Sequence, residues 1–163
     1  MKTNLIIWAL MLCGITANAN ERVSLNRNWT FTSADGKSKT INVPHDYLIE
    51  QPWVAPAADE KADNSDAGAN IKSRLSARGF KELESGTYTK TITAENAWKG
   101  KRIILDFQGI MYVADVFLNG KQIGKTDYGY LGFEIDITSK LKYGQDNEIK
   151  VVCGQGSPKD SRW

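Results

Sequence analysis

The side chains best suited to acid–base chemistry are His45, which is the single histidine of the chain, and Asp46, which follows it. Together with a serine they would supply the residue types of a hydrolytic triad. A triad depends on spatial geometry that adjacency in sequence does not provide, and no serine lies in a nucleophile elbow. We reject a triad and expect Pro44-His45-Asp46 to form a structural turn in which Asp46 accepts backbone N–H bonds, with ligand contact as the alternative.

Metal and thiol chemistry have few candidates. The chain contains one histidine and two cysteines, Cys13 and Cys153, which are too few and too far apart for a metal site. Cys153 ends the strand-like run Ile149 to Cys153, where a buried small apolar residue is the expected role. We predict no catalytic residues, no metal and no cofactor within this chain.

The first 19 residues have the pattern of a secretory signal peptide. Lys2 supplies a positive start, Leu5 to Cys13 is apolar, and small residues lead up to Ala19. The apolar run is shorter than the about 20 residues that a membrane-spanning helix needs. We expect cleavage after Ala19, export to the periplasm or the medium, and a mature domain over residues 20–163 with no membrane attachment. A lipid anchor is disfavoured because the bulky Leu12 precedes the first cysteine.

The charge balance argues against two classes of partner. The chain has 21 Lys and Arg residues against 19 Asp and Glu residues, a formal net charge of +2. Mixed and nearly neutral charge offers no electrostatic attraction to nucleic acid or to an anionic membrane surface. We therefore expect neither as a partner.

The elements that must position these residues are strands. Asn119-Gly120 separates two segments of strand-like composition and is the strongest short-range signal for a hairpin, because a type I′ turn needs positive φ at both central residues. From Phe133 onward apolar and acidic residues alternate with period 2, as in a half-buried strand. The strands expected around this turn cover Ile103–Phe107, Met111–Leu118, Lys121–Gly124 and Phe133–Ile137.

Further strands are expected on both sides of this region, at Trp29–Thr32, Thr40–Val43, Thr87–Thr93 and Asn147–Cys153. In the third of them Tyr88, Lys90 and Ile92 fall on one face and the threonines on the other. About eight short strands separated by turn residues predict an all-β sandwich or jelly roll. Between Glu50 and Gly86 no period is sustained, and the stretch is either a solvated loop or a cover for a site or neighbour.

At this point a family resemblance becomes visible. The chain is similar to the N-terminal sugar-binding domain of glycoside hydrolase family 2, the family of β-galactosidases, β-glucuronidases and β-mannosidases. The resemblance implies a jelly-roll β-sandwich that is galactose-binding-domain-like, and it covers nearly the whole mature chain. The matching pieces, in the family's order, are LNRNWTF, VPHDYLIEQP, GTYTKTI, WKGKRIILDFQGI, DVFLNGKQIG, GYLGFEIDIT, NEIKV and SRW.

The sequence departs from the family in two ways. Thr87-Tyr88 stands where the family usually has Trp-Tyr, and PHDY stands where it has PHDW, which are variations of core or rim. In the family an immunoglobulin-like domain and a TIM barrel follow SRW, whereas this chain ends at Trp163. We therefore expect a truncated sequence whose partners include the missing C-terminal domains.

The resemblance also implies where catalysis takes place. Family members retain configuration and use two carboxylates, and the resemblance places both in the barrel that this chain lacks. Glu82 and Glu84 are neighbours with no element to fix them, so we interpret them as solvated charges. The parent would be a retaining β-glycosidase, and this chain alone is expected to be inactive.

The remaining chemistry is substrate contact. An Asp or Arg hydrogen-bonds sugar hydroxyls with charge assistance, and a Trp stacks on a pyranose ring. Bracing against a neighbouring domain is the alternative that we favour for Arg162 and Trp163. For Tyr128 and Tyr130 we expect packing over the hairpin, with exposed platforms as the alternative. The candidate substrate-binding residues are Asp160, Ser161, Arg162, Trp163, His45 and Asp46.

The sequence leads to one principal hypothesis and two alternatives. The chain is a non-catalytic, carbohydrate-binding domain of an exported family 2 glycoside hydrolase, β-galactosidase-like, that acts in carbohydrate breakdown. The alternatives are a stand-alone carbohydrate-binding module and a sandwich that only packs on other domains. A self-contained groove would favour the first alternative, and an exposed apolar patch without a groove would favour the second.

Overall fold

The structure is a computed structural model that describes residues 20–53, 81, 85–111 and 113–154. In this part of the chain the regular structure consists of eight β-strands and two short 3₁₀ helices, as the sequence predicts. The strands are β1 (Trp29–Ser33), β2 (Ser38–Ile41), β3 (Gly86–Ala94), β4 (Ile104–Phe107), β5 (Ala114–Leu118), β6 (Lys121–Thr126), β7 (Phe133–Asp136) and β8 (Gln145–Cys153). The 3₁₀ helices are η1 (Tyr47–Glu50) and η2 (Asn96–Trp98).

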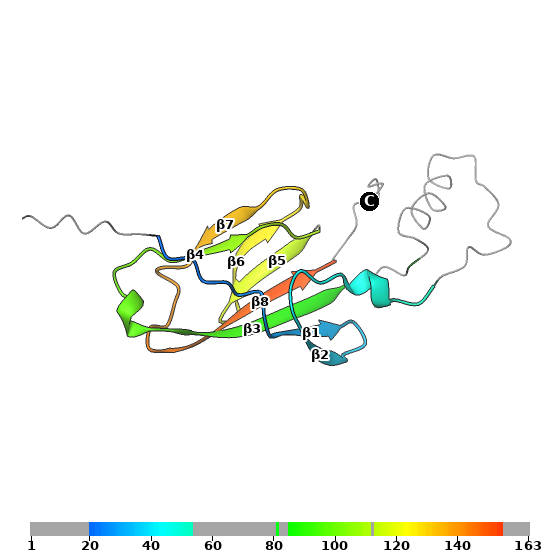
Figure 1. Cartoon of the computed structure of the whole chain (residues 1–163), viewed down its shortest axis with the longest axis horizontal. Helices are drawn as coiled ribbons and strands as arrows, with labels where there is room; N and C mark the ends of the chain where they lie inside the picture. Colours follow the sequence, from blue (N-terminus) through cyan, green and yellow to red (C-terminus); the bar gives the residue numbers. More distant parts are fainter. Residues whose placement is uncertain (1–19, 54–80, 82–84, 112, 155–163) are drawn as a thin grey trace, which may run out of the picture.

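The strands form two antiparallel sheets (Figure 1). The larger sheet has six strands in the order β2-β1-β3-β8-β5-β6, and the smaller one consists of β4 and β7. The long strands β3 and β8 pair over their whole length, from Gly86 opposite Cys153 to Ala94 opposite Gln145. The predicted all-β jelly-roll sandwich is confirmed, although β4 and β7 lie in the second layer rather than beside the hairpin.

The hairpin predicted at Asn119-Gly120 is confirmed. Asn119 has a φ of 51° and Gly120 a φ of 78°, the positive values that a two-residue type I′ turn requires. β5 and β6 follow directly on the two sides of this turn. β5 begins at Ala114 rather than at Met111, so Met111 and Val113 of the predicted strand lie in the preceding loop.

The threonine-rich strand β3 separates a buried face from an exposed one. Tyr88 is buried, and Lys90 and Ile92 on the same face are half-buried, as the sequence predicts. The threonines alternate with them and point to the outer face of the larger sheet, which is the consequence of the two-residue period of a strand. β3 thus carries the core on one side and a row of hydroxyls on the other.

The core lies between the two sheets. Ile135 on β7 projects toward β6, where a Cβ added to Gly124 would lie 2.5 Å from its Cδ1 atom. Phe107 and Phe133 stack at one end of the smaller sheet, with ring centroids 4.8 Å apart. The most completely buried side chains are Ile137, Ile149, Val116 and Asn147. Each buried aliphatic side chain of this kind contributes roughly 1.5–3 kcal/mol to stability.

Asn147 is the one residue of the polar and charged types that is buried in the described part of the chain. Its Oδ1 accepts hydrogen bonds from Nδ2 of Asn119 and from the N–H of Lys142, both at 2.8 Å. Its Nδ2 donates to the carbonyl oxygens of Lys142 and Gln145, both at 3.0 Å. The amide therefore uses both donors and both acceptor sites, and it ties the hairpin turn to the turn before β8.

The strand expected at Thr40–Val43 is displaced toward the N-terminus. β2 ends at Ile41, and the N–H of Val43 donates instead to the carbonyl of Asn26 at 2.8 Å. The Val43–Pro44 peptide bond is cis, and proline offers no N–H to a ladder. The chain therefore leaves the sheet at this point and enters η1.

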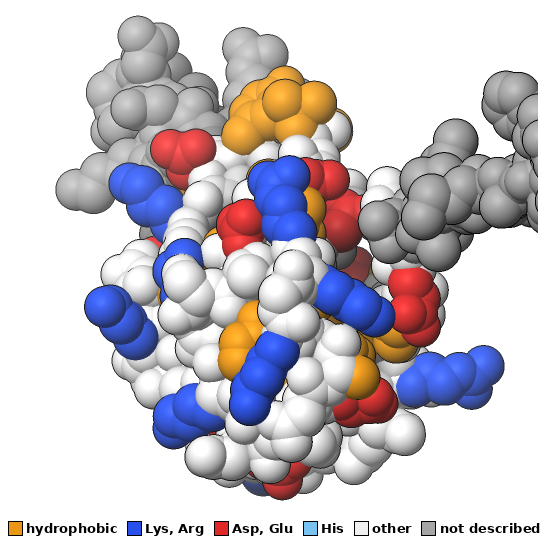
Figure 2. All heavy atoms as spheres, turned by 90° about the vertical axis from the view of Figure 1, so that its left-hand side faces the viewer, with side chains coloured by type: hydrophobic (Ala, Val, Ile, Leu, Met, Phe, Trp, Pro, Cys, Tyr) orange, Lys and Arg blue, Asp and Glu red, His pale blue; other side chains and the backbone are white. Residues whose placement is uncertain are grey.

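The signal peptide predicted for residues 1–19 and most of the stretch between Glu50 and Gly86 fall outside the described residues. At the two ends of this stretch Trp53 and Lys81 form an isolated antiparallel bridge, and the Lys81 ammonium lies 4.1 Å from the centroid of the Trp53 ring. Figure 2, which looks at one end of the molecule, shows basic and acidic side chains interspersed.

Among the described residues, no helix has the length and apolar character that crossing a membrane would require.

Candidate functional site

The two predicted site residues that the structure describes, His45 and Asp46, lie where the chain leaves β2 for η1. Asp46 is the N-cap residue of η1, and its Oδ1 accepts a hydrogen bond from the N–H of Leu48 at 2.9 Å. A carboxylate at an N-cap satisfies one of the N–H groups that a helix leaves unpaired. Asp46 is thus used within the turn, as the structural interpretation expected.

His45 belongs to an aromatic cluster at one end of the larger sheet. This cluster, called here the His45 cluster, consists of Phe31, His45, Tyr47 and Tyr88. The Phe31 ring centroid lies 4.9 Å from that of His45, 5.6 Å from that of Tyr47 and 5.0 Å from that of Tyr88. Offset and edge-on contacts of this kind contribute about 0.5–1.5 kcal/mol per pair beyond their buried area.

The His45 imidazole is held by one hydrogen bond and leaves its other nitrogen unpaired. Nδ1 lies 2.9 Å from the Tyr88 hydroxyl. Nε2 is buried and has no hydrogen-bond partner among the described residues. The closest carboxylate oxygen recorded for it is Oε1 of Glu50, at 3.7 Å, which is beyond hydrogen-bonding distance.

Charged side chains stand at the rim of the cluster. Lys39 on β2 forms an ion pair with Glu50, and this hydrogen bond holds the pKa of Glu50 below its ordinary value. Glu50 is 49 % exposed, so the pair contributes little to stability. The ion pair with Lys39 keeps the Glu50 carboxylate ionised beside the His45 imidazole.

The buried hydroxyl and thiol near the cluster are protonated at neutral pH. Burial raises the pKa of Tyr88 well above its ordinary value, and burial raises the pKa of Cys153 to about 12. A thiol acts as a nucleophile only as the thiolate. Cys153 therefore has the predicted role of a buried apolar residue.

The described residues provide no recognisable catalytic centre. All Asp and Glu residues among them are at least partly exposed, and no group of three or more His, Cys, Asp and Glu residues among them is arranged to hold a metal. The imidazole of His45 contacts a phenol rather than a serine hydroxyl. In the described part of the chain, the His45 imidazole therefore has the role of a packed and hydrogen-bonded member of the cluster.

A second group of exposed side chains lies in the loops at the same end of the sandwich. It is called here the loop patch and consists of Met111, Tyr128, Tyr130 and Leu131, which are 56–66 % exposed. The two tyrosine ring centroids are 5.8 Å apart. The expectation that these tyrosines pack over the hairpin is wrong, because the loop after β6 turns back against the carbonyl oxygens of Phe107 and Gln108 and leaves both rings at the surface.

The end of β8 lies beside the His45 cluster and next to the loop before β5. Cys153 pairs with Gly86 on one side and with Ala114 on the other. The N–H of Gly154 donates to the carbonyl of Val113 at 3.1 Å. The other predicted site residues, Asp160, Ser161, Arg162 and Trp163, follow in the sequence and lie outside the described residues.

The contacts that build the cluster were not visible in the sequence. Tyr88 reaches His45 across 43 positions of the chain, and the period of β3 identified Tyr88 only as a buried residue. The requirement for glycine at position 86 was not visible either. It arises because a Cβ there would clash with the Phe31 ring. No local pattern marked either contact.

Raising the pH above about 9 will destabilise the chain through Cys153. The thiol has a pKa of about 12 in the folded chain against 9.0 ordinarily, so the unfolded chain loses its proton first and stability falls as the pH rises between these values. The slope is about 1.4 kcal/mol per pH unit for one group. Urea unfolding at pH 8 and pH 11 will show a loss about 2 kcal/mol larger in the native chain than in Cys153→Ala. Equal losses would contradict this assignment.

Tyr88→Phe will lower the free energy of unfolding by about 1–2 kcal/mol, because it leaves Nδ1 of the partly buried His45 ring without its partner. Replacing both partners, in His45→Leu/Tyr88→Phe, removes the unpaired group and will cost less than the sum of the two single changes. Urea unfolding of the three variants measures this coupling. Additive losses would show that the hydrogen bond has no role in stability.

The fold defines the class: an all-β sandwich domain of two antiparallel sheets. The family model described as glycosyl hydrolase 2 galactose-binding domain-like matches residues 72–160. This match covers more than half of the chain and includes β3 to β8. The chain belongs to this family.

Relatives from the genus Bacteroides agree with this assignment. A β-glucuronidase of Bacteroides fragilis is 32 % identical over 93 % of this chain and 19 % of the relative. A β-galactosidase of Bacteroides ovatus is 28 % identical over 88 % of this chain and 16 % of the relative. The crystal structure of a glycosyl hydrolase family 2 member from Bacteroides cellulosilyticus is 29 % identical, with a TM-score of 0.61 over 81 % of this chain and 17 % of that protein. The chain thus spans less than a fifth of each.

Proposed function

We propose that this chain is the non-catalytic, N-terminal sugar-binding module of an exported family 2 glycoside hydrolase, with a β-galactosidase-like parent that breaks down carbohydrates. The observation that carries the proposal is the family match over residues 72–160. The relatives are named β-glucuronidase and β-galactosidase, and the chain spans 19 % and 16 % of them. Hydrolysis therefore belongs to parts of such an enzyme outside this chain.

The proposed sugar contact is at the end of the sandwich that carries the His45 cluster. Residues 160–163 follow six positions after Gly154, and β8 ends beside that cluster. The Arg162 guanidinium provides donors for sugar hydroxyls, and the Trp163 ring provides an apolar face for a pyranose. In this proposal His45 and Asp46 support the surface and do not themselves contact the sugar.

The loop patch is the proposed contact with the rest of the parent enzyme. It presents Met111, Tyr128, Tyr130 and Leu131 with more than half of each side chain exposed. Clustered exposed apolar side chains mark surfaces that bind another protein or domain. Gly154, which follows β8, donates its N–H to the carbonyl of Val113 in the loop before β5. Met111 of the patch belongs to the same loop.

Export is proposed from the leader pattern alone. Expression of the full chain in a Gram-negative host and N-terminal sequencing of the exported product will give Asn20 as the first residue. An uncleaved product that begins at Met1 would contradict the signal peptide.

Sugar binding is tested by isothermal titration calorimetry of the mature chain with methyl β-D-galactopyranoside. We expect a Kd in the millimolar range, about −4 kcal/mol, and a weakening of about tenfold, or 1.4 kcal/mol, in Trp163→Ala and in Arg162→Ala. Trp98→Phe, in η2 at the other end of β3, will bind like the native chain.

Two outcomes would overturn this assignment. Unchanged affinity in both variants would remove residues 162 and 163 from the contact and leave the bracing interpretation. A complete lack of binding would leave a sandwich that only packs on other domains. A Kd in the micromolar range for the chain alone would instead favour a stand-alone carbohydrate-binding module.

A further inference from the structure

The outer face of the larger sheet contains a hollow where β1 begins beside β3. β1 pairs with β3 only from Thr30 opposite Thr89 to Ser33 opposite Gly86. Beyond Thr89, β3 keeps its partner β8 on one side but has no strand of the sheet on the other. Asn28, with a φ of 58°, turns the chain away at this point. The shortened pairing thus opens a notch in the sheet.

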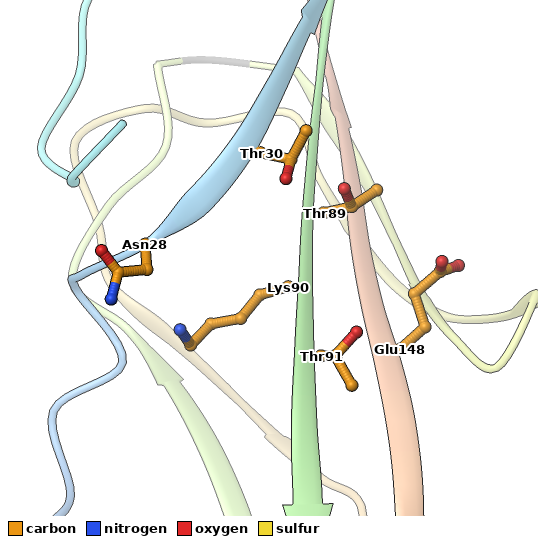
Figure 3. A pocket seen from close by; sticks show the side chains of 6 residues that line it. All are labelled: Asn28, Thr30, Thr89, Lys90, Thr91 and Glu148. Atoms are coloured by element: carbon orange, nitrogen blue, oxygen red, sulfur yellow. The ribbon is translucent and has the colours of Figure 1, made fainter. Parts of the chain in front are cut away.

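This hollow has a volume of about 360 Å³ and is open to solvent. Its volume falls within the range of about 300–1,000 Å³ found for small-molecule sites. In Figure 3 Thr89 and Thr91 lie on one side of β3 and Lys90 on the other. The lining residues are Asn28, Thr30, Thr89, Lys90, Thr91 and Glu148.

Two hydroxyls near the hollow have hydrogen-bond partners among the described residues, and those of the hollow have none. Toward one edge of the same face the hydroxyl of Thr32 bonds to that of Ser38 at 2.8 Å. Toward the far end of β3 the hydroxyl of Thr93 donates to Asp146 at 2.6 Å. No hydrogen bond joins the hydroxyls of the three hollow threonines, Thr30, Thr89 and Thr91, to another described residue.

The charges of the hollow are arranged asymmetrically. The Lys90 ammonium donates to the carbonyl of Arg27 at 2.7 Å, and Lys90 lies on the other side of β3 from Thr89 and Thr91. Glu148 lies opposite Thr91 on β8, is exposed, and forms no ion pair with another described residue. The charge on the same face as the threonine hydroxyls is therefore a carboxylate, which accepts hydrogen bonds only.

The matching ligand chemistry is a neutral polyol. Threonine hydroxyls donate and accept, and a carboxylate accepts from a pair of neighbouring hydroxyl groups. A ligand that carries its own carboxylate would be repelled by Glu148. No lining residue offers an aromatic face, so affinity must come from hydrogen bonds that replace those to water, each with a net value of only about 0.5–1.5 kcal/mol.

We propose that this hollow is a second sugar site, selective for neutral over acidic sugars. Its threonines point away from the His45 cluster, because side chains alternate along a strand and Thr30 and Thr89 are next in sequence to the buried Phe31 and Tyr88. The site uses no residue of the His45 cluster and none of residues 155–163. It goes beyond the proposed function, because it can exist whether or not those residues contact a sugar.

The test is a titration of the ¹⁵N-labelled mature chain, followed by amide NMR spectra, with methyl β-D-galactopyranoside and with methyl β-D-glucuronide. We expect millimolar binding of the galactoside, with shifts of the amides of Thr30, Thr89 and Thr91, and binding of the glucuronide that is at least about fivefold weaker, or 1 kcal/mol. Valine is close to threonine in shape and is favoured in strands, so Thr89→Val/Thr91→Val keeps the fold and removes two hydroxyls. It will weaken the galactoside about tenfold.

Two further variants make the test specific. Thr87→Val, on the same face of β3 but outside the lining, will bind as the native chain does. Glu148→Gln removes the charge that repels the glucuronide. In this variant the affinity for the glucuronide will be within about twofold of that for the galactoside.

The outcomes separate this inference from the proposed function. Shifts confined to Gly86, Cys153 and the residues after them would support the proposed contact and overturn the hollow as a site. Shifts confined to the hollow, lost in the double valine variant, would support the hollow and count against residues 160–163. Equal affinity of the double valine variant and the native chain would also overturn the hollow.

Discussion

Replacing Asn147 by leucine will lower the free energy of unfolding by about 3 kcal/mol, because a buried polar group left without its partner costs about 1–3 kcal/mol. The amide makes four hydrogen bonds, to Asn119, to both backbone groups of Lys142 and to Gln145. Leucine has the same number of side-chain heavy atoms and the same branching as asparagine but can make none of these hydrogen bonds. With a typical stability of about 5–15 kcal/mol, this loss will be visible as a large shift of the urea midpoint.

Gln145→Ala is the matched control for this prediction. Gln145 is exposed and lies two positions before Asn147 on β8, and it contributes only its backbone carbonyl to the network. Its replacement will change stability by no more than about 0.5 kcal/mol. A similar loss in the two variants, or a loss below about 1 kcal/mol for leucine, would show that the amide does not join the two turns.

The second large effect is expected from Gly86→Ala. The added Cβ would lie 2.4 Å from Cε2 of Phe31 and 3.5 Å from Cδ1 of Tyr47. Phe31 is only 3 % exposed, so its ring has no free space to move into. Overpacking of this kind costs about 1–3 kcal/mol, and we expect about 2 kcal/mol in urea unfolding followed by tryptophan fluorescence.

A double variant identifies the clash as the cause. Phe31→Leu removes the ring atoms that the new methyl group would meet, so Gly86→Ala/Phe31→Leu will lose at least about 1 kcal/mol less than the sum of the two single changes. Additive losses would mean that Gly86 is required for its backbone conformation instead. In that case the close packing of the His45 cluster would not explain this glycine.

The fold was predictable because its signals are local. Asn119-Gly120 specifies a type I′ turn through two positive φ values, and the alternation in β3 places Tyr88 inside and the threonines outside whatever the neighbouring strands are. The sheet order was not predictable in this way. β3 lies between β1 and β8, and pairing between distant segments leaves no trace in a short window of sequence.

The candidate site was predictable in its residue types but not in its geometry. The turn chemistry of Pro44-His45-Asp46 correctly indicated a carboxylate that accepts backbone N–H bonds. The partner of His45 is a tyrosine on another strand, which the sequence could not indicate. The hollow beside β1 arises from where strand pairing ends, so it is a property of register and not of any motif.

The central claim is that this family 2 domain binds sugar without cleaving it. Saturation-transfer-difference NMR of the purified mature chain with 4-nitrophenyl β-D-galactopyranoside tests both parts in one sample, because released nitrophenol has its own signals. The account predicts saturation transfer to the sugar protons with no release of nitrophenol over the experiment. Released nitrophenol would contradict the non-catalytic assignment, and a lack of transfer to the sugar protons would contradict sugar binding by this chain.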